Sequence, residues 1–134
     1  PILAAMRRLL PLLALLTACN APLDPMAYER AGELTDADAR LPDDGSPYDE
    51  HTVIADRGWD IDVTVSSEDF DPYLVVLTPA GDRIEIDDGG EGLDSHLVLP
   101  APMRGEYTLW VNTMRPEGRG AYTLTVRSAP GAPE

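Results

Sequence analysis

The alternation that decides the fold is WDIDVTVS at residues 59–66. Every odd-numbered residue of this stretch is aromatic or aliphatic, and every even-numbered residue is an aspartate or carries a hydroxyl. Successive side chains of a β-strand point to opposite faces, so the pattern predicts a strand with one buried and one solvated face. The stretch therefore indicates an antiparallel sheet packed on a core.

Further short apolar runs surround this strand at intervals of about 8 to 12 residues. The turn at residues 79–82 predicts a hairpin between strands at 73–77 and 83–87. Other strands are expected at 51–55, 97–99, 107–111 and 122–126, with an edge strand at 32–35. No segment has a convincing helical period, so the residues predict an all-β sandwich or barrel of about seven to eight strands.

The N-terminal segment has the features of a secretory signal. Arg7 and Arg8 precede an apolar run at 9–16, which is about half the roughly 20 residues that a membrane-spanning helix needs. We expect residues 1–18 to be the signal peptide region, with translation starting at Met6.

The residues Leu16-Thr17-Ala18-Cys19 resemble the bacterial lipobox, whose cysteine is acylated and becomes the first residue of the mature protein. Cys19 is the sole cysteine and has no disulfide partner within the chain. We therefore expect an exported protein anchored in the bacterial envelope through a lipid on Cys19, with a soluble secreted protein as the alternative. By resemblance to enterobacterial lipoproteins, Asn20 after the cysteine favours the outer membrane.

The remaining chain fits one domain. We expect residues 19–31 to form the lipidated cysteine and a flexible tether, 32–128 the β-sandwich, and 129–134 a flexible C-terminal tail.

The charge of the chain disfavours partners with phosphate backbones. The formal net charge is -14, and all 10 basic residues are arginines. Removal of the signal segment leaves 24 acidic against 8 basic residues, a net charge of -16. Such a surface repels nucleic acid and anionic lipid, and it either attracts cations and basic proteins or serves solubility alone.

The order and spacing of several short motifs carry a family resemblance. These motifs are 44–50 (DGSPYDE), Gly58, 70–74 (FDPYL), 79–81 (PAG), 87–90 (DDGG), Ser95, 105–109 (GEYTL) and 120–124 (GAYTL). In them the stretch from 32 to 127 resembles the bacterial pre-peptidase C-terminal (PPC) domain. The resemblance implies an antiparallel jelly-roll-like β-sandwich, usually a non-catalytic appendage of secreted peptidases. Relatives bind extracellular polymers, and some collagen-binding relatives hold calcium. The 134 residues themselves are not expected to include a peptidase domain.

The sequence contains no pattern typical of a catalytic site. It has no G-x-S-x-G and no H-E-x-x-H motif, so we expect no enzyme activity. His51 is expected to pack in or beside a strand and His96 to face solvent, because a zinc site usually needs three or four ligands.

Aspartates in the expected loops are candidate calcium ligands: Asp43, Asp44, Asp49, Asp69, Asp71, Asp87, Asp88 and Asp94. Calcium takes six to eight oxygen ligands, which loops can supply. The alternative is that these aspartates form turns through local hydrogen bonds. No cofactor is expected to be required, and calcium stays an open alternative.

The second candidate site is centred on Trp110. By alternation, its side chain points away from the core, on the same face as Thr108 and Asn112. If the last two strands pair, Thr123, Thr125 and Arg127 join this face. An exposed tryptophan beside hydroxyl and amide groups fits a sugar ring or a protein loop. The alternative is that the second sheet or the tether covers it. Trp59 is assigned to the core.

Together these features predict a lipid-anchored, non-catalytic β-sandwich that binds a protein or a polysaccharide at the cell envelope. The alternative function is a calcium-stabilised structural spacer, or a secretion or assembly accessory of an extracellular peptidase system.

Overall fold

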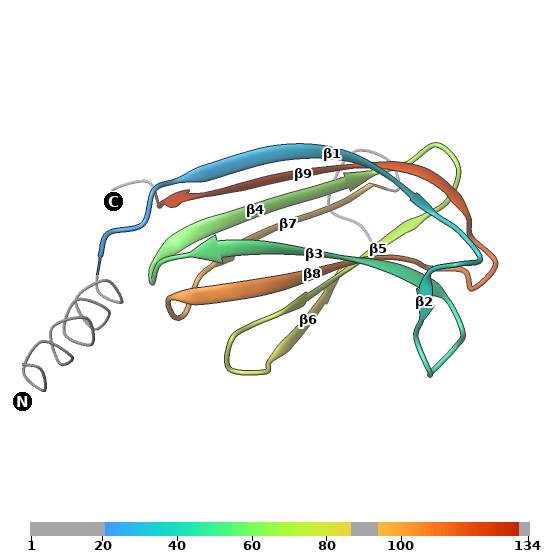
Figure 1. The fold of residues 1–134 in the computed structure, drawn as a ribbon, viewed down its shortest axis with the longest axis horizontal. Helices are drawn as coiled ribbons and strands as arrows, with labels where there is room; N and C mark the ends of the chain where they lie inside the picture. The colour runs from blue at the N-terminus through green and yellow to red at the C-terminus, as the bar shows by residue number, and fades with distance from the viewer. Residues whose placement is uncertain (1–20, 87–93, 132–134) are drawn as a thin grey trace, which may run out of the picture.

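In the computed structural model, which describes residues 21–86 and 94–131, the chain folds into nine β-strands in two sheets (Figure 1). The strands are β1 (Met26–Leu34), β2 (Ala39–Arg40), β3 (Pro47–Ala55), β4 (Trp59–Ser66), β5 (Pro72–Leu77), β6 (Arg83–Ile86), β7 (Ser95–Pro100), β8 (Gly105–Thr113) and β9 (Gly120–Pro130). The expected all-β sandwich is confirmed.

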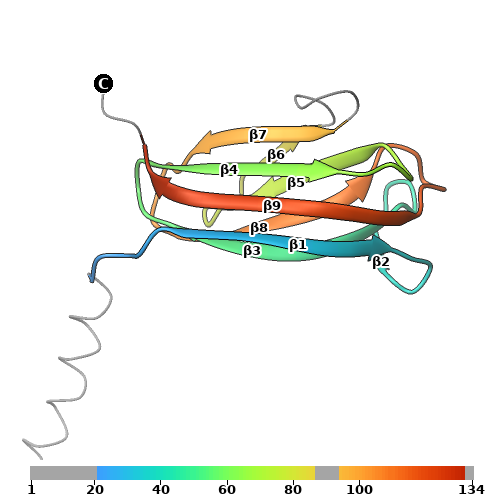
Figure 2. The same cartoon turned by 90° about the horizontal axis from the view of Figure 1, so that it is seen from above.

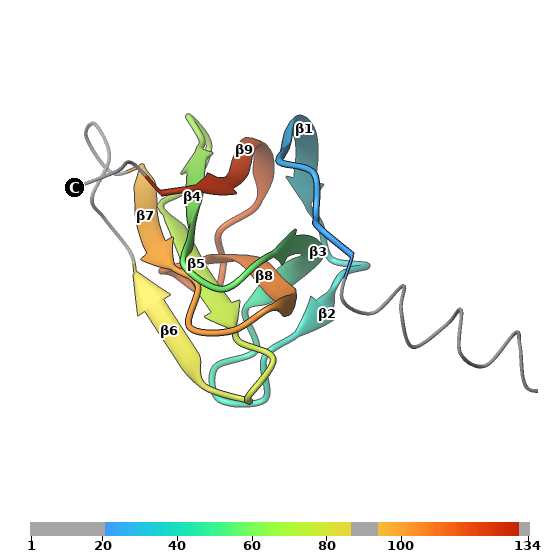
Figure 3. The same cartoon turned by 90° about the vertical axis from the view of Figure 1, so that its left-hand side faces the viewer.

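The two sheets lie face to face as two layers. The four-stranded sheet has the order β1-β9-β4-β7, and the five-stranded sheet has the order β2-β3-β8-β5-β6. Figure 2 looks onto the four-stranded sheet, and Figure 3 looks along the strands, so that the two layers are seen end on.

The strand pairs are nested around one hairpin. In sequence order, the β5–β6 hairpin lies at the centre. The strands on either side of it pair in turn, β4 with β7, then β3 with β8, then β1 with β9, and all these pairs are antiparallel. A long hairpin rolled across two sheets in this way is a jelly roll. The hairpin expected from residues 73–77 and 83–87 is confirmed as far as residue 86, since Leu74 to Leu77 pair with Ile86 to Arg83.

The core fills the space between the sheets with the inward residues of alternating strands. Ile61, Val63 and Val65 of β4 are at most 1% exposed, as the sequence pattern predicts. Trp59 is partly buried and packs against this core. On β5, Leu74 and Val76 face inward, and Val75 is fully buried although it faces outward. Side chains on the outer face of the five-stranded sheet must therefore cover Val75.

The sandwich extends beyond the boundaries expected from sequence. β1 begins at Met26, so residues 26–31 belong to a strand and not to a tether, and β9 continues to Pro130. β1 pairs with β9 over nine residues, from Met26 opposite Ser128 to Leu34 opposite Gly120. The expected signal peptide and Cys19 lie outside the described residues. Among the described residues, no element is a helix with the length and apolarity that crossing a membrane requires.

Candidate functional site

The outer face of the five-stranded sheet carries an aromatic surface centred on Trp110. Trp110 lies in β8, opposite Glu50 of β3 and Val75 of β5. Its ring centroid is 4.7 Å from that of Tyr48, with an angle of 36° between the ring planes. Two rings at this distance attract one another, and this attraction adds to the free energy gained by burying their apolar area.

A cation approaches the same ring from β6, on the opposite side of β8 from Tyr48 and on the same face of the sheet. The Arg83 guanidinium carbon of β6 is 5.6 Å from the centroid of Trp110, within the range of a cation–π interaction. Arg83 also pairs with Glu85, at 2.9 Å between Nη2 and Oε1. In the strand order, β3 and β6 lie on opposite sides of β8, so Tyr48 and Arg83 flank the indole.

The indole N–H of Trp110 is buried and has no hydrogen-bond partner among the described residues. Buried tryptophan N–H groups usually find an acceptor, and leaving one without a partner costs about 1–3 kcal/mol. The indole is therefore held by its ring contacts and not by a hydrogen bond.

A shallow hollow of about 260 Å³ lies on the same side of the sheet. Tyr73, Arg83 and Glu85 form its sheet side, and Asp43 and Asp44 of the loop between β2 and β3 form another wall. We call the surface formed by Tyr48, Tyr73, Arg83, Glu85 and Trp110 the Trp110 face. It combines rings with charged groups of both signs.

Two residues expected beside Trp110 have different roles. Thr108 lies on this face and is half-buried. Asn112 is 2% exposed, and its amide donates to Ser46 Oγ at 2.9 Å and to the Pro47 carbonyl at 2.7 Å. Asn112 therefore fastens the loop before β3 and is not free to bind a ligand.

The condition that would bring Thr123, Thr125 and Arg127 beside Trp110, pairing of the last two strands, is not met. β8 pairs with β3 and β5, whereas β9 pairs with β1 and β4 in the other sheet. Thr123, Thr125 and Arg127 consequently lie on the outer face of the four-stranded sheet and do not join Trp110. The six residues expected to form one surface are divided between two.

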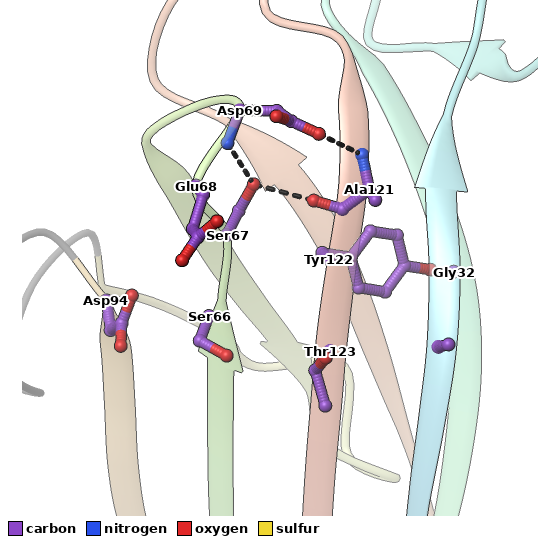
Figure 4. A pocket seen from close by; sticks show the side chains of 10 residues that line it. Gly32, Ser66, Ser67, Glu68, Asp69, Asp94, Ala121, Tyr122 and Thr123 are labelled. Carbon is purple, nitrogen blue, oxygen red and sulfur yellow. Dashed lines mark hydrogen bonds between the residues drawn. The ribbon is translucent and has the colours of Figure 1, made fainter.

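The outer face of the four-stranded sheet has its own open hollow, of about 500 Å³ (Figure 4). Thr123 and Ser66 form its floor, and the loop of Ser67, Glu68 and Asp69 lies at its rim. This loop is fastened to β9, because Ser67 Oγ donates to the Ala121 carbonyl at 2.7 Å and Asp69 Oδ2 accepts the Ala121 N–H at 2.9 Å. Asp69 is thus engaged by the backbone.

The other candidate calcium ligands are spread over several elements. Asp44 Oδ1 accepts from the Ser46 N–H at 2.9 Å and from its hydroxyl at 2.6 Å, and these bonds lower the pKa of Asp44. Asp43 is exposed in the same loop. Asp71 precedes β5, and Asp94 precedes β7. Asp87 and Asp88 lie outside the described residues. Within residues 21–86 and 94–131, no three His, Cys, Asp or Glu side chains are grouped to hold a metal ion.

Asp49, another candidate ligand, belongs to a hydrogen-bonded chain between the two sheets. The Tyr122 hydroxyl of β9 donates to Asp49 Oδ2 of β3 at 2.7 Å, and His51 Nε2 is 2.9 Å from the same hydroxyl. Because the hydroxyl proton is directed at Asp49, Nε2 is the donor in the second bond.

Burial shifts the pKa of all three members of this chain. It raises the pKa of Asp49, assisted by the charge of Asp38, and lowers the pKa of His51, assisted by Arg30. Burial and the bond to Asp49 raise the pKa of Tyr122. These hydrogen bonds form a polar cross-link between the two sheets, and the expectation that His51 packs in or beside a strand is confirmed. His96 lies on the outer face, 2.8 Å from Asp62.

Sequence reasoning missed Tyr48, Tyr73, Arg83 and Glu85 as neighbours of Trp110. The alternation of side chains along each strand predicts that all four point outward. Which of them lie beside Trp110 depends on the order of the strands in the sheet, which the sequence alone did not predict. Comparison with protein-family models gives no match, and comparison with curated proteins gives none either.

Proposed function

We propose that this chain is an exported protein, lipidated at Cys19 and held at the bacterial envelope, in the outer membrane. Its β-sandwich is a non-catalytic module of the PPC type that binds a polysaccharide or a protein on the Trp110 face. The lipid anchor and the family rest on the lipobox and on the ordered motifs of the sequence.

The observation that carries the binding role is the packing of Trp110 beside Tyr48 with Arg83 across the ring. Trp110 and Tyr48 are both partly buried, and the ring area that stays open to solvent suits the face of a sugar or an apolar side chain at a small entropic cost. Glu50, Thr52 and Glu85 are exposed on the same face and offer hydrogen bonds around the rings. Tryptophan, tyrosine and arginine are also the residues most enriched at binding hot spots.

The test uses a purified domain of residues 20–134 against a panel of bacterial and extracellular polysaccharides and proteins. Once a ligand is identified, Trp110→Ala should weaken its binding about thirtyfold, because a hot-spot residue contributes about 2 kcal/mol or more. Trp110→Phe preserves part of the packing over Val75 and should lose less affinity. Thermal melts of each variant separate lost binding from lost folding.

Thr125→Ala is the matched control, because Thr125 is exposed on the outer face of the four-stranded sheet. It should bind as the wild type does. A ligand whose affinity is unchanged by Trp110→Ala but falls with Thr125→Ala would contradict the Trp110 face as the binding site.

A further inference from the structure

The N-terminal segment joins the sandwich at one end of its long axis. Met26 lies opposite Ser128, and Trp59 lies opposite Pro130, so the start of β1 and the end of β9 share this end with the loop between β3 and β4 (Figure 1). We call it the tether end and define it by residues 21–25, 56–58, 78–82, 101–104 and 131. The far end consists of residues 35–46, 67–71 and 114–119, with Asp94.

The reach of the segment before β1 restricts which end can meet a membrane. Seven residue steps separate Cys19 from Met26, and they span roughly 25 Å when fully extended. β1 has nine residues and is about 30 Å long. A lipid on Cys19 therefore cannot let the far end rest on the bilayer, because the segment would have to run back along the whole of β1.

The distribution of charge also favours contact of the tether end, and not of the far end, with a membrane. The described part of the far end holds nine acidic residues and three arginines: Asp36, Asp38, Arg40, Asp43, Asp44, Glu68, Asp69, Asp71, Asp94, Arg115, Glu117 and Arg119. The tether end holds three aspartates and two arginines: Asp24, Asp56, Arg57, Asp82 and Arg104. At about 30 Å, the far end is several Debye lengths from a bilayer that touches the tether end, so its repulsion from anionic lipid is screened.

The tether end also exposes an apolar side chain on an ordered loop. Met103, in the loop between β7 and β8, is 39% exposed. The Met103 loop is held in place, because the Tyr107 hydroxyl donates to the Met103 carbonyl at 2.6 Å and the Ala101 N–H donates to the Trp59 carbonyl at 2.7 Å. These bonds fix Met103 on a loop at the end where β1 begins, next to the segment that leads to Cys19.

We propose that the tether end is a membrane-contacting surface, which rests on the phospholipid headgroups of the bilayer that holds the lipid on Cys19. Met103 enters the headgroup layer, the strands stand along the membrane normal, and the acidic far end points away. This inference rests on the proposed lipid anchor. It leaves the Trp110 face open to the side, where a ligand can approach it parallel to the membrane.

The test uses the full chain, processed in a bacterium and reconstituted in vesicles of phosphatidylethanolamine and phosphatidylglycerol. Cys19 is the sole native cysteine, and lipid consumes its thiol, so an introduced cysteine is the free one. Met103→Cys and Met114→Cys form a matched pair, because both methionines are similarly exposed, at 39% and 41%, and lie at opposite ends. Each variant carries an environment-sensitive fluorophore, and nitroxide-labelled lipids serve as the quencher.

A blue shift and loss of emission at position 103, with neither at position 114, would support the proposal. A lipidated chain that binds vesicles without quenching at position 103 would overturn it and leave the lipid anchor intact. Quenching at Glu50→Cys, on the outer face of the five-stranded sheet, equal to that at position 103 would indicate a domain lying on its side and would also overturn it. Mass spectrometry of the Cys19 peptide without lipid would reject both the anchor and the inference.

Discussion

The Tyr122 hydroxyl donates a 2.7 Å hydrogen bond to Asp49 Oδ2 and so joins β9 of one sheet to β3 of the other. The two sheets otherwise meet mainly through apolar side chains of the core. We expect Tyr122→Phe to lower the free energy of unfolding by about 1–2 kcal/mol, because a half-buried carboxylate loses its donor. Tyr28→Phe is the control, since the Tyr28 hydroxyl bonds the Thr52 carbonyl in an exposed setting and should cost less. Urea unfolding of both variants measures the difference, and equal losses would contradict a special role for the cross-link.

His51 makes the stability of the domain depend on pH. Its pKa in the folded state is lowered by burial, so the unfolded chain takes up a proton first as the pH falls through about 6.5. Proton uptake by the unfolded state favours unfolding, and stability should decrease as the pH falls from 7.5 to 5.5. We expect His51→Gln to reduce this decrease, since glutamine does not titrate and its amide can still donate to Tyr122.

Melts of the wild type and of His51→Gln at pH 7.5 and 5.5 isolate this contribution, because Asp49 is present in both proteins. His96→Gln, on the outer face, leaves His51 in place and should keep the dependence that His51 creates. If the wild type and His51→Gln lost the same stability between the two pH values, the proton linkage would lie elsewhere.

Gly32 is required because the Tyr122 side chain crosses β1 at this position. A Cβ on residue 32 would overlap the Tyr122 ring and hydroxyl. Gly32→Ala should therefore destabilise the domain by about 1–3 kcal/mol, as overpacking does in a filled core. Ala31→Ser, at the preceding and exposed position of the same strand, is the control and should stay near the wild-type stability. A Gly32→Ala variant as stable as the control would show that Tyr122 can move without cost.

The sequence predicted the direction of the side chains along each strand well, but it predicted strand partners only within the β5–β6 hairpin. Alternation correctly assigns Trp110 outward and Ile61 inward, because it depends only on the geometry of a single strand. Pairing β8 with β9 assumes that consecutive strands are neighbours, which holds roughly two-thirds of the time. The nested jelly roll violates that assumption, because residues 114–119 cross from one sheet to the other. β1 was only partly recognised, since Arg30 interrupts the inward row of Met26, Tyr28, Gly32 and Leu34.

The acidic loops give a final prediction, that calcium will not stabilise the domain. Carboxylate oxygens of Asp44 and Asp69 accept hydrogen bonds from backbone N–H groups, and Asp49 accepts one from the Tyr122 hydroxyl. Each of these bonds would have to be shared or broken for the oxygen to bind a cation, while calcium needs six to eight oxygens together. Thermal melts of residues 20–134 with calcium and with chelator should therefore superimpose. A clear upward shift with calcium would contradict this, because a ligand that binds only the folded state raises its stability. Asp44→Asn and Asp94→Asn would then locate the ion, since the variant that abolishes the shift marks a ligating loop.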